Sequence, residues 1–427
     1  MEEILGASAL SLGRAIKTRQ VSSTEVVAAY LQRIDQVNPA INAIVQRVDE
    51  RALAEARAAD DALARGEISG PFHGVPFTVK DIFDVAGIVS AAGLEERAAF
   101  VPERDAVVVA RMREAGAILL GKTNCPPGGT GVVTDNPLYG ATRNPYDLDR
   151  SPSGSSGGEA AAIAAGASPL GLGSDSGGSI RTPAHYCGIA ALRPTVGRVP
   201  NTGAFELPGG LSDPRSQIGP MSRWAEDLRP VLAIVAGVDW RDSGVIPMPL
   251  GDPASVEPRG LRVACYADDG IAPPTPETTQ AVQDAARALA DAGVVVEQTR
   301  PPALDQVWDI TVRYWQSAEL TGAEMGRLIR DWDEFRTTML GFVERYDLIL
   351  CPVADEPAVP LMAEGNGIYC LPYSLTGYPC AVVRAGTSPQ GLPIGVQVVA
   401  RPWREDVALA AAERIEMTLS GWSPPPL

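Results

Sequence analysis

The stretch that decides the fold is residues 151–180, SPSGSSGGEAAAIAAGASPLGLGSDSGGSI. Its only charged residues are Glu159 and Asp175. A glycine- and serine-rich run is usually a flexible linker, but this one encloses an apolar helix-like segment, GEAAAIAAGA, and an apolar strand-like segment, SPLGLG. Continued to residue 203, the stretch holds 11 of the 43 glycines. Because glycine lets the backbone approach other groups closely, we interpret this stretch as buried backbone whose loops lie close to another group.

The sequence on either side alternates short β-rich runs with helix-like runs. VPFTV and GAILLG flank the helix-like DAVVVARMREAG, and LRVACYA, ETTQAVQDAARALADAG and VVVEQTR repeat the pattern later. This βαβ rhythm predicts a mixed, mainly parallel β-sheet covered by helices on both faces, within a single large α/β/α domain. We expect one domain over 1–427, with N-terminal helices in 1–68, a central core in 69–240, and a C-terminal half in 258–427 that completes the sheet and the pocket.

The composition narrows the classes of function. The chain has 52 acidic and 36 basic residues, a formal net charge of -16, which disfavours nucleic acid or an anionic membrane as a partner. The sequence shows no secretory-type apolar segment at its start and no uncharged run near the ~20 residues of a membrane span. The six cysteines form no C-x-x-C pair, so we expect buried thiols, a cytoplasmic location, and no metal or organic cofactor.

Lysine is rare in this chain. Only Lys17, Lys80 and Lys122 occur, and the other 33 basic residues are arginines. A codon bias accounts for the general preference for arginine over lysine. A lysine inside an apolar run then stands out, because a desolvated lysine can lose its proton whereas an arginine effectively cannot. Lys80, in GVPFTVKDIFDVAG, fits that description.

Two motifs suggest other functions. GAILLGKT at Gly116–Thr123 matches a P-loop, but a helix-like segment precedes it and its apolar residues form a strand themselves, which favours a core strand. GSSGG matches a nucleophile elbow at Ser156, yet His185 follows by only 29 residues and His73 lies upstream, so a Ser-His-Asp triad is disfavoured. A P-loop ATPase and a non-catalytic binding module remain open alternatives.

A serine hydrolase without a histidine base needs another base, and a buried neutral lysine is the recognised one. Lys80 in GVPFTVKDIFDVAG, Ser155 in SPSGSSGGEAAAIAAGA and Ser179 in GLGSDSGGSIRTPAHYCGIAALRPTVGRVP resemble the amidase signature family, with separations of 75 and 24 residues. The resemblance extends from TEVVAAYLQRIDQVNPAINAIV to GLPIGVQVVARPWREDVALAAAERIE. It is most specific between Gly74 and Pro200.

The resemblance implies a Ser-cisSer-Lys triad. In this family the serine at the Ser179 position attacks the amide carbonyl, the serine at the Ser155 position follows a cis peptide bond and relays the proton, and the lysine at the Lys80 position is the base. Backbone N–H groups that precede Ser179 are expected to bind the oxyanion. Those donors are Ser176, Gly177 and Gly178, and the residues with supporting roles are Gly154, Ser156, Asp175 and Arg181.

These features predict hydrolysis of a small carboxamide or anilide through a Ser179 acyl-enzyme, with an esterase side activity. The expected partner is a small-molecule amide, and a homodimer is a family-level expectation. A glutamine-dependent amidotransferase A-type subunit is the main alternative. The sequence does not specify the acyl and amine groups. We interpret His185 and Cys187 as packing residues beside the loop. The aromatic residues could line a pocket for an aryl group, but an aromatic helix face is more often core; they are Trp308, Tyr314, Trp315 and Trp332.

Overall fold

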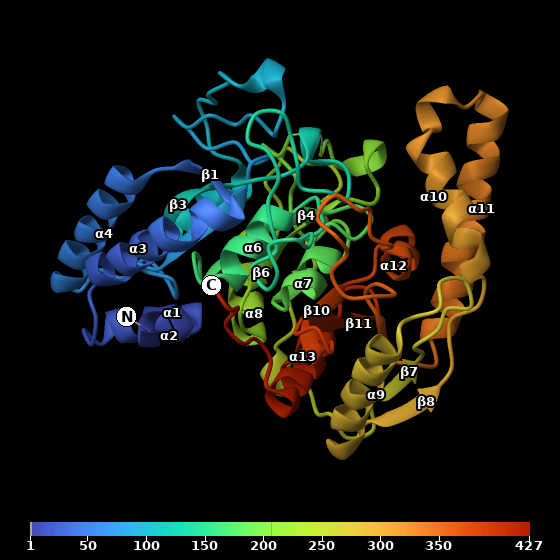
Figure 1. The fold of residues 1–427 in the computed structure, drawn as a ribbon. Helices are drawn as coiled ribbons and strands as arrows, with labels where there is room; N and C mark the ends of the chain where they lie inside the picture. Colours follow the sequence, from blue (N-terminus) through green and yellow to red (C-terminus); the bar gives the residue numbers. More distant parts are fainter. Residues whose placement is uncertain (1, 206) are drawn as a thin grey trace.

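A sheet of eleven strands runs through this computed structural model, which describes residues 2–205 and 207–427 (Figure 1). The strands are β1 (Ile44–Arg47), β2 (Pro76–Lys80), β3 (Ile118–Thr123), β4 (Leu170–Asp175), β5 (Ala190–Arg193), β6 (Gln217–Ser222), β7 (Arg262–Cys265), β8 (Val295–Gln298), β9 (Leu348–Pro352), β10 (Cys380–Thr387) and β11 (Pro393–Ala400). Their order across the sheet is β1-β3-β2-β4-β6-β5-β10-β11-β9-β7-β8.

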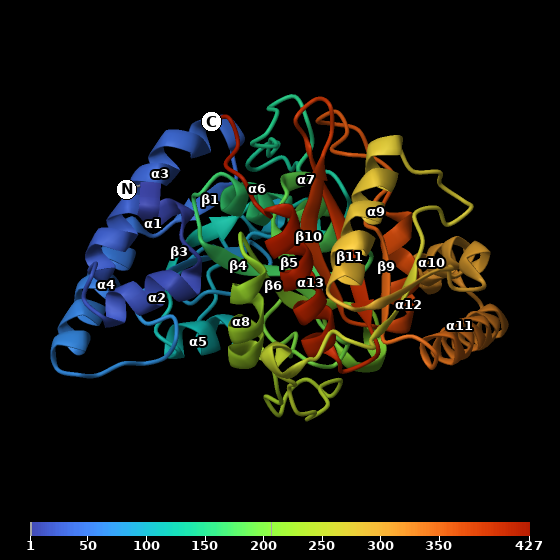
Figure 2. The same cartoon turned by 90° about the horizontal axis from the view of Figure 1, so that it is seen from below.

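Helices cover both faces of this sheet. They are α1 (Glu2–Gly6), α2 (Ala9–Lys17), α3 (Ser23–Ile41), α4 (Asp49–Ala64), α5 (Val107–Glu114), α6 (Gly157–Ala164), α7 (Arg181–Cys187), α8 (Leu228–Val235), α9 (Pro276–Asp291), α10 (Val307–Trp315), α11 (Gly322–Val343), α12 (Leu371–Thr376) and α13 (Glu405–Leu419). Alternate residues of β10 face different helices, since Ala381 and Val383 join the cluster of α8, α9 and α13 whereas Val382 joins that of α6 and α7. Figure 2 shows α9 and α13 lying across β10 and β11.

The mixed α/β sheet predicted from the sequence is confirmed, but the expectation that it is mainly parallel is wrong. Among the described residues, four strand pairings are parallel and six are antiparallel. The βαβ rhythm holds for β2, β3 and β4 and again for β7, β8 and β9. Elsewhere no α-helix separates β5 from β6 or β10 from β11 among the described residues, and both pairs are antiparallel. β1 also lies within residues 1–68, where only helices were expected.

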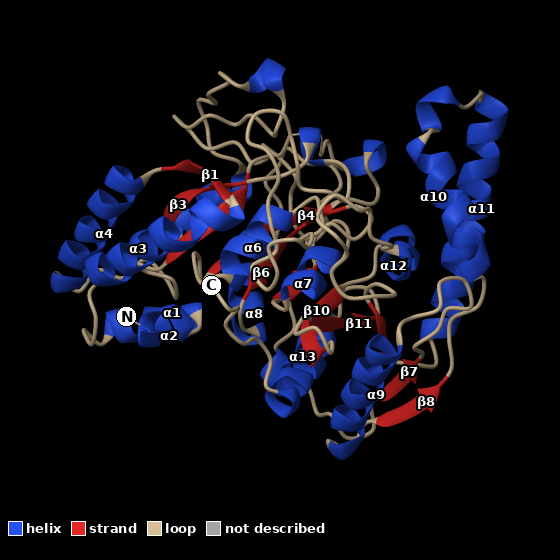
Figure 3. Cartoon of the chain, in the orientation of Figure 1, coloured by secondary structure: helices blue, strands red, loops and turns tan. Residues whose placement is uncertain are grey.

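The register of β2 and β4 places the candidate residues together. The two strands are parallel neighbours, with Thr78 opposite Gly171 and Val79 opposite Leu172. Their carboxyl ends therefore meet at one edge of the sheet, where Lys80 ends β2 and Asp175 ends β4. Figure 3 shows that long connecting loops gather above β4 on this side of the molecule.

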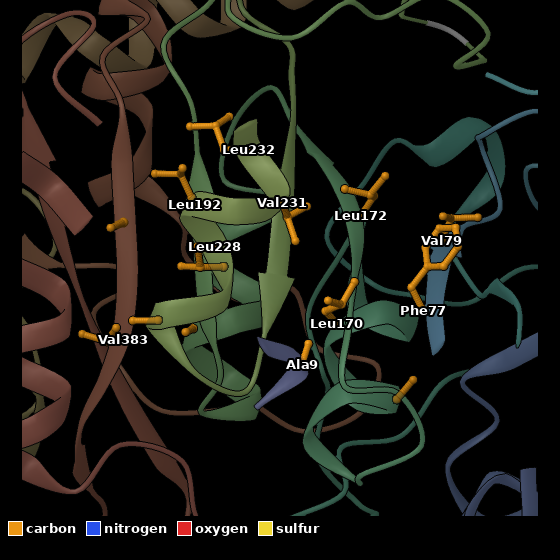
Figure 4. Close-up of a cluster of buried hydrophobic side chains, with 14 of the residues drawn as sticks. Ala9, Phe77, Val79, Leu170, Leu172, Leu192, Leu228, Val231, Leu232 and Val383 are labelled. Atoms are coloured by element: carbon orange, nitrogen blue, oxygen red, sulfur yellow. The ribbon is translucent and has the colours of Figure 1, made fainter. Parts of the chain in front are cut away.

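A large apolar core holds these strands in register. Its side chains come from α8 (Leu228, Val231 and Leu232) and from the strands beneath (Phe77, Val79, Leu170, Leu172 and Leu192), as Figure 4 shows. All of them are fully buried. Complete burial of one such side chain contributes about 1.5–3 kcal/mol, so the core fixes the strand ends that carry the site.

Two further observations bear on the sequence expectations. All six cysteines are buried with free thiols, as predicted. None of the described helices combines the length and the apolar character needed to span a bilayer.

Candidate active site

Lys80 is the fully buried last residue of β2. Its Nζ donates hydrogen bonds to Ser155 Oγ at 2.5 Å, to Ser174 Oγ at 3.0 Å and, more weakly, to Gly129 O at 3.4 Å. Burial lowers the pKa of Lys80 to about 8, against the opposing influence of Cys125 and Asp175. A large neutral fraction is therefore present near pH 8, and neutral lysine can accept a proton.

Ser155 lies in the turn that enters α6, and the peptide bond between Gly154 and Ser155 is cis. The next N–H, that of Ser156, donates to Ser179 O at 3.1 Å and joins this turn to the loop after β4. Ser156 Oγ is hydrogen-bonded to the backbone N–H and carbonyl of Ser174, at 3.3 Å each. Ser156 thus holds the end of β4 in place through these two hydrogen bonds, and it affects the position of Ser155 only indirectly.

The loop from β4 to α7 is organised around the Asp175 carboxylate. This group accepts N–H bonds from Gly178 at 2.8 Å and Ile180 at 3.1 Å, and Arg181 binds it with Nε and Nη2 at 2.9 Å each. Burial alone would raise the pKa of Asp175, but Arg181, the nearby Arg193 and the N–H donors hold that pKa well below its ordinary value. The geometry fits the supporting role that the sequence suggested for Asp175 and Arg181.

The backbone of the same loop requires glycine at one position. Gly178 has φ +128°, and a Cβ there would lie 3.0 Å from Thr182 Oγ1. Because the Gly178 N–H is bonded to Asp175, it is not free to bind an oxyanion, which corrects the expectation for this residue. Among the described residues, no hydrogen-bond acceptor engages the N–H groups of Ser176, Gly177 or Ser179.

A cavity of about 670 Å³ opens onto these loops. Ser155, Ser174 and Ser179 are among the residues that line it. The rest of its wall is mostly apolar and includes Ile82, Val132, Phe205, Leu207, Pro208, Tyr314 and Trp315, but the carboxylates of Asp213 and Glu364 also line it. A larger cavity of about 840 Å³ lies on the other side of Asp213 and Ser216, but none of these three serines lines it.

The sequence matches the Amidase family over residues 25–330 and 317–409. The chain belongs to the amidase signature family. Among its relatives, the A-type subunit of the glutamyl-tRNA(Gln) amidotransferase of Moorella thermoacetica is 32% identical over 97% of each chain. The acylamidase of Rhodococcus erythropolis is 32% identical over 96% of this chain and 94% of the relative. The solved structure of 6-aminohexanoate cyclic dimer hydrolase superposes with a TM-score of 0.88, at 28% identity over 99% of each chain.

The P-loop-like motif and the two histidines, which competed with the amidase signature assignment, do not line the cavity. Residues 118–123 of the P-loop-like motif form the buried strand β3, and its Lys122 pairs with the buried Asp81 at 2.9 Å. His73 Nε2 donates to Ala59 O, and the fully buried His185 donates to Glu356 O at 3.0 Å. Both histidines therefore pack in the structure, as expected for His185, and Cys187 is buried in the same helix.

The aromatic residues divide into two groups. Trp332 is buried, as the core interpretation predicted, with its Nε1–H bonded to Leu375 O at 2.7 Å, whereas Trp308 is 54% exposed, so its interpretation as a core residue is wrong. Tyr314 and Trp315, at the end of α10, line the cavity, which corrects their interpretation as core residues. Helical spacing alone did not separate the aromatic residues that line the cavity from those that do not. The middle of α10 packs on the protein, whereas its last two residues, Tyr314 and Trp315, line the cavity.

Sequence reasoning missed two residues beside the amidase signature site. Ser174 contacts Lys80 only because β4 and β2 are neighbours, and its position in LGLGSD gave no signal of this. Arg215 is fully buried beside the loop of Ser176, in a chain where arginine is the common basic residue. A basic residue close to the mostly apolar QIGPM strand was the only available hint for Arg215.

Proposed function

We propose that this amidase signature protein hydrolyses carboxamides through an acyl-enzyme on Ser179. The observation that carries the proposal is the contact of the buried Lys80 Nζ with Ser155, which lines the same cavity as Ser179. Family membership supports amide hydrolysis as the reaction class. Lys80, Ser155 and Ser179 are the catalytic residues of the proposal.

In the proposed acylation step, neutral Lys80 accepts the Ser155 hydroxyl proton while Ser155 accepts that of Ser179. The Ser179 oxygen then forms a bond to the amide carbonyl carbon. The resulting oxyanion binds N–H groups of Ser176, Gly177 and Ser179, which have no other acceptor among the described residues. The proton returns from Lys80 through Ser155 to the amide nitrogen, and the C–N bond breaks.

Deacylation reverses the relay with water in place of the amine. The same base removes a proton from water as its oxygen attacks the acyl carbon, and Ser179 recovers its proton as the carboxylic acid leaves. The overall change is amide plus water to carboxylic acid plus amine or ammonia. Ser174 gives Lys80 Nζ a second hydroxyl partner at 3.0 Å, so the lysine keeps its position while it exchanges protons.

The lining of the cavity supports an apolar acyl or aryl group in the substrate. Tyr314 and Trp315 present aromatic surface, and Phe205 and Leu207 extend it. A volume of about 670 Å³ suits a small carboxamide or anilide.

The role of an amidotransferase component is the second candidate, because the A-type subunit of the glutamyl-tRNA(Gln) amidotransferase is 32% identical to this chain. The acylamidase is equally identical, so identity does not separate the two functions. The mostly apolar cavity favours an amide with a hydrocarbon group over free glutamine.

A fluorophosphonate probe tests the proposed nucleophile. We expect stoichiometric labelling of the wild-type chain on Ser179, no labelling of Ser179→Ala, and release of ammonia from phenylacetamide by the wild type alone. Labelling of another residue, or equal labelling of both proteins, would refute the Ser179 assignment. Hydrolysis of free glutamine without hydrolysis of aryl or anilide amides would favour the amidotransferase.

A further inference from the structure

The residue Arg215 precedes β6 and lies directly behind the loop of Ser179. Its side chain is fully buried, and Nη2 donates to Ser176 O at 3.2 Å. The same Nη2 is 3.7 Å from the point where a Cβ on Gly177 would lie. The guanidinium group therefore sits against the peptide unit that joins Ser176 to Gly177.

Neighbouring groups fix this guanidinium in place. Its Cζ lies 4.9 Å from the ring centre of Tyr314 and 5.7 Å from that of Trp315, both at cation–π distance. Arg193 Nη2 donates to Arg215 O at 2.6 Å, which anchors the backbone. Arg215 thus connects the loop before Ser179 to the aromatic wall of the cavity.

Positive charge exceeds negative charge beneath this loop. Arg181, Arg193 and Arg215 face the carboxylates of Asp175 and Asp213, so three cations meet two anions among the described residues. Asp175 is already engaged by Arg181 and by backbone N–H groups. Asp213 accepts from Ser216 N at 3.1 Å and from Tyr314 OH at 3.4 Å.

The Arg215 guanidinium stays charged in the pH range in which Lys80, the proposed base, becomes neutral. Burial lowers the pKa of Arg215 to about 10, and the charge of Arg193 acts in the same direction. Lys80 titrates lower, with a pKa of about 8. Arg215 is therefore a cation at the pH values where neutral Lys80 forms.

A cation beside a peptide carbonyl oxygen changes the hydrogen-bond donor strength of the N–H in the same peptide unit. It favours the resonance form with negative charge on oxygen, and this form makes the N–H more positive and a stronger donor. The carbonyl of Ser176 and the N–H of Gly177 belong to one peptide unit. That N–H has no acceptor among the described residues, and Gly177 lines the cavity.

We propose that Arg215 is a positioning residue that strengthens the Gly177 N–H as an oxyanion donor by polarising the Ser176–Gly177 peptide. The inference rests on the proposed function, since it assumes that Ser179 is the nucleophile. A purely structural role accounts poorly for Arg215, because an apolar side chain could pack beside the rings of Tyr314 and Trp315 without the cost of burying a charge. The excess positive charge also stabilises the oxyanion directly across this low-dielectric region.

The chain offers a matched control in Arg223. This arginine is also fully buried, lies near the rings of Tyr30 and Trp422, and donates to Ser168 O at 2.8 Å and Ala7 O at 3.0 Å. None of these partners belongs to the loop of Ser179. Loss of Arg223 therefore reproduces the loss of a buried cation without a change at the proposed oxyanion site.

The experiment follows inactivation by a fluorophosphonate probe, because phosphonylation of Ser179 also develops negative charge on an oxygen. Arg215→Gln, Arg215→Met, Arg215→Lys and Arg223→Gln are compared with wild type, and thermal unfolding identifies the folded variants. Removal of a direct oxyanion donor costs about 10²- to 10³-fold in rate, so an effect transmitted through a peptide should be about tenfold. We expect the first-order inactivation constant to fall about tenfold in the neutral Arg215 variants, with the half-saturating probe concentration changed less than about twofold.

Arg215→Lys keeps the positive charge and should retain more than half of the wild-type inactivation constant, and Arg223→Gln should match wild type. A weaker half-saturation with an unchanged first-order constant would overturn the proposal in favour of a packing role. A folded lysine variant that is about tenfold slower than wild type would overturn it as well, and this criterion needs no folded neutral variant. Failure of the wild type to label on Ser179 would instead refute the proposed function.

Discussion

Replacement of Lys80 by arginine separates proton transfer from positive charge. With a pKa of about 8, half of the Lys80 side chains are neutral at pH 8 and roughly one in eleven at pH 7. An arginine with a pKa above ~12 is neutral in only about one molecule in 10⁴ at pH 8. Lys80→Arg should therefore lower kcat/KM at least about 10³-fold, almost as far as Lys80→Met, if the side chain is the base.

Lys122→Arg is the matched control for this substitution. Lys122 is also fully buried, but it pairs with Asp81 at 2.9 Å and donates to Ser90 Oγ at 2.6 Å. Arginine satisfies a carboxylate at least as well as lysine does, so Lys122→Arg should keep at least about a third of the activity. Both variants add bulk to a packed interior at a cost of about 1–3 kcal/mol, which thermal unfolding measures.

The assay is hydrolysis of phenylacetamide, or of a better amide from a small panel, between pH 6 and 10. For wild type, kcat/KM should rise about tenfold per pH unit below pH 8 and reach a plateau above it, since only neutral Lys80 accepts a proton. Recovery of more than a tenth of wild-type activity in folded Lys80→Arg would refute the general-base role. The lysine would then act as a fixed cation for Ser155 and Ser174.

Three further outcomes are expected. The double variant His73→Gln, His185→Gln should keep the shape of the pH–rate profile, because neither ring lines the cavity; loss of the alkaline plateau in a folded double variant would contradict this. Trp315→Ala should raise KM for an aryl amide about tenfold with a smaller change in kcat, as steady-state kinetics would show; equal effects on aryl and acetamide substrates would argue against an aromatic wall. Burial raises the pKa of Glu159 to about 8, so its contribution to stability is complete below pH 4.5 and is lost as the pH rises through 8. Glu159→Gln should therefore flatten the urea-measured stability in this range by up to about 1.4 kcal/mol per pH unit, and an unchanged slope would exclude Glu159 as its source.

The parts of the fold that local sequence specifies were predictable. GEAAAIAAGA forms α6, LGLGSD forms β4, and the P-loop-like segment forms β3, as the apolar runs indicated. Strand direction was not predictable to the same degree. A βαβ rhythm describes neighbours along the chain, whereas β6 lies between β4 and β5 through contacts formed only in three dimensions.

Some residues of the candidate site were likewise predictable from the sequence, and others were not. Lys80, Ser155 and Ser179 stand in motifs that carry a family resemblance. In the structure Ser155 and Ser179 line one cavity, and Lys80 is hydrogen-bonded to Ser155. Ser174 and Arg215 contact those motifs through strand register and through the segment before β6, for which the sequence holds no spacing rule. The bond from Gly178 to Asp175 also depends on loop geometry, which the order of glycines and serines does not specify.

The six buried cysteines make the protein a convenient host for site-specific labelling. Burial raises the pKa of Cys265 to about 11 and of Cys125 to about 12, so these thiols form little thiolate at neutral pH. Maleimide reagents, which need an accessible thiolate, should modify the native protein slowly. A single cysteine introduced at the 54% exposed Trp308 would then react first, and a dye there would report on movement of α10 near the cavity without removal of any native cysteine.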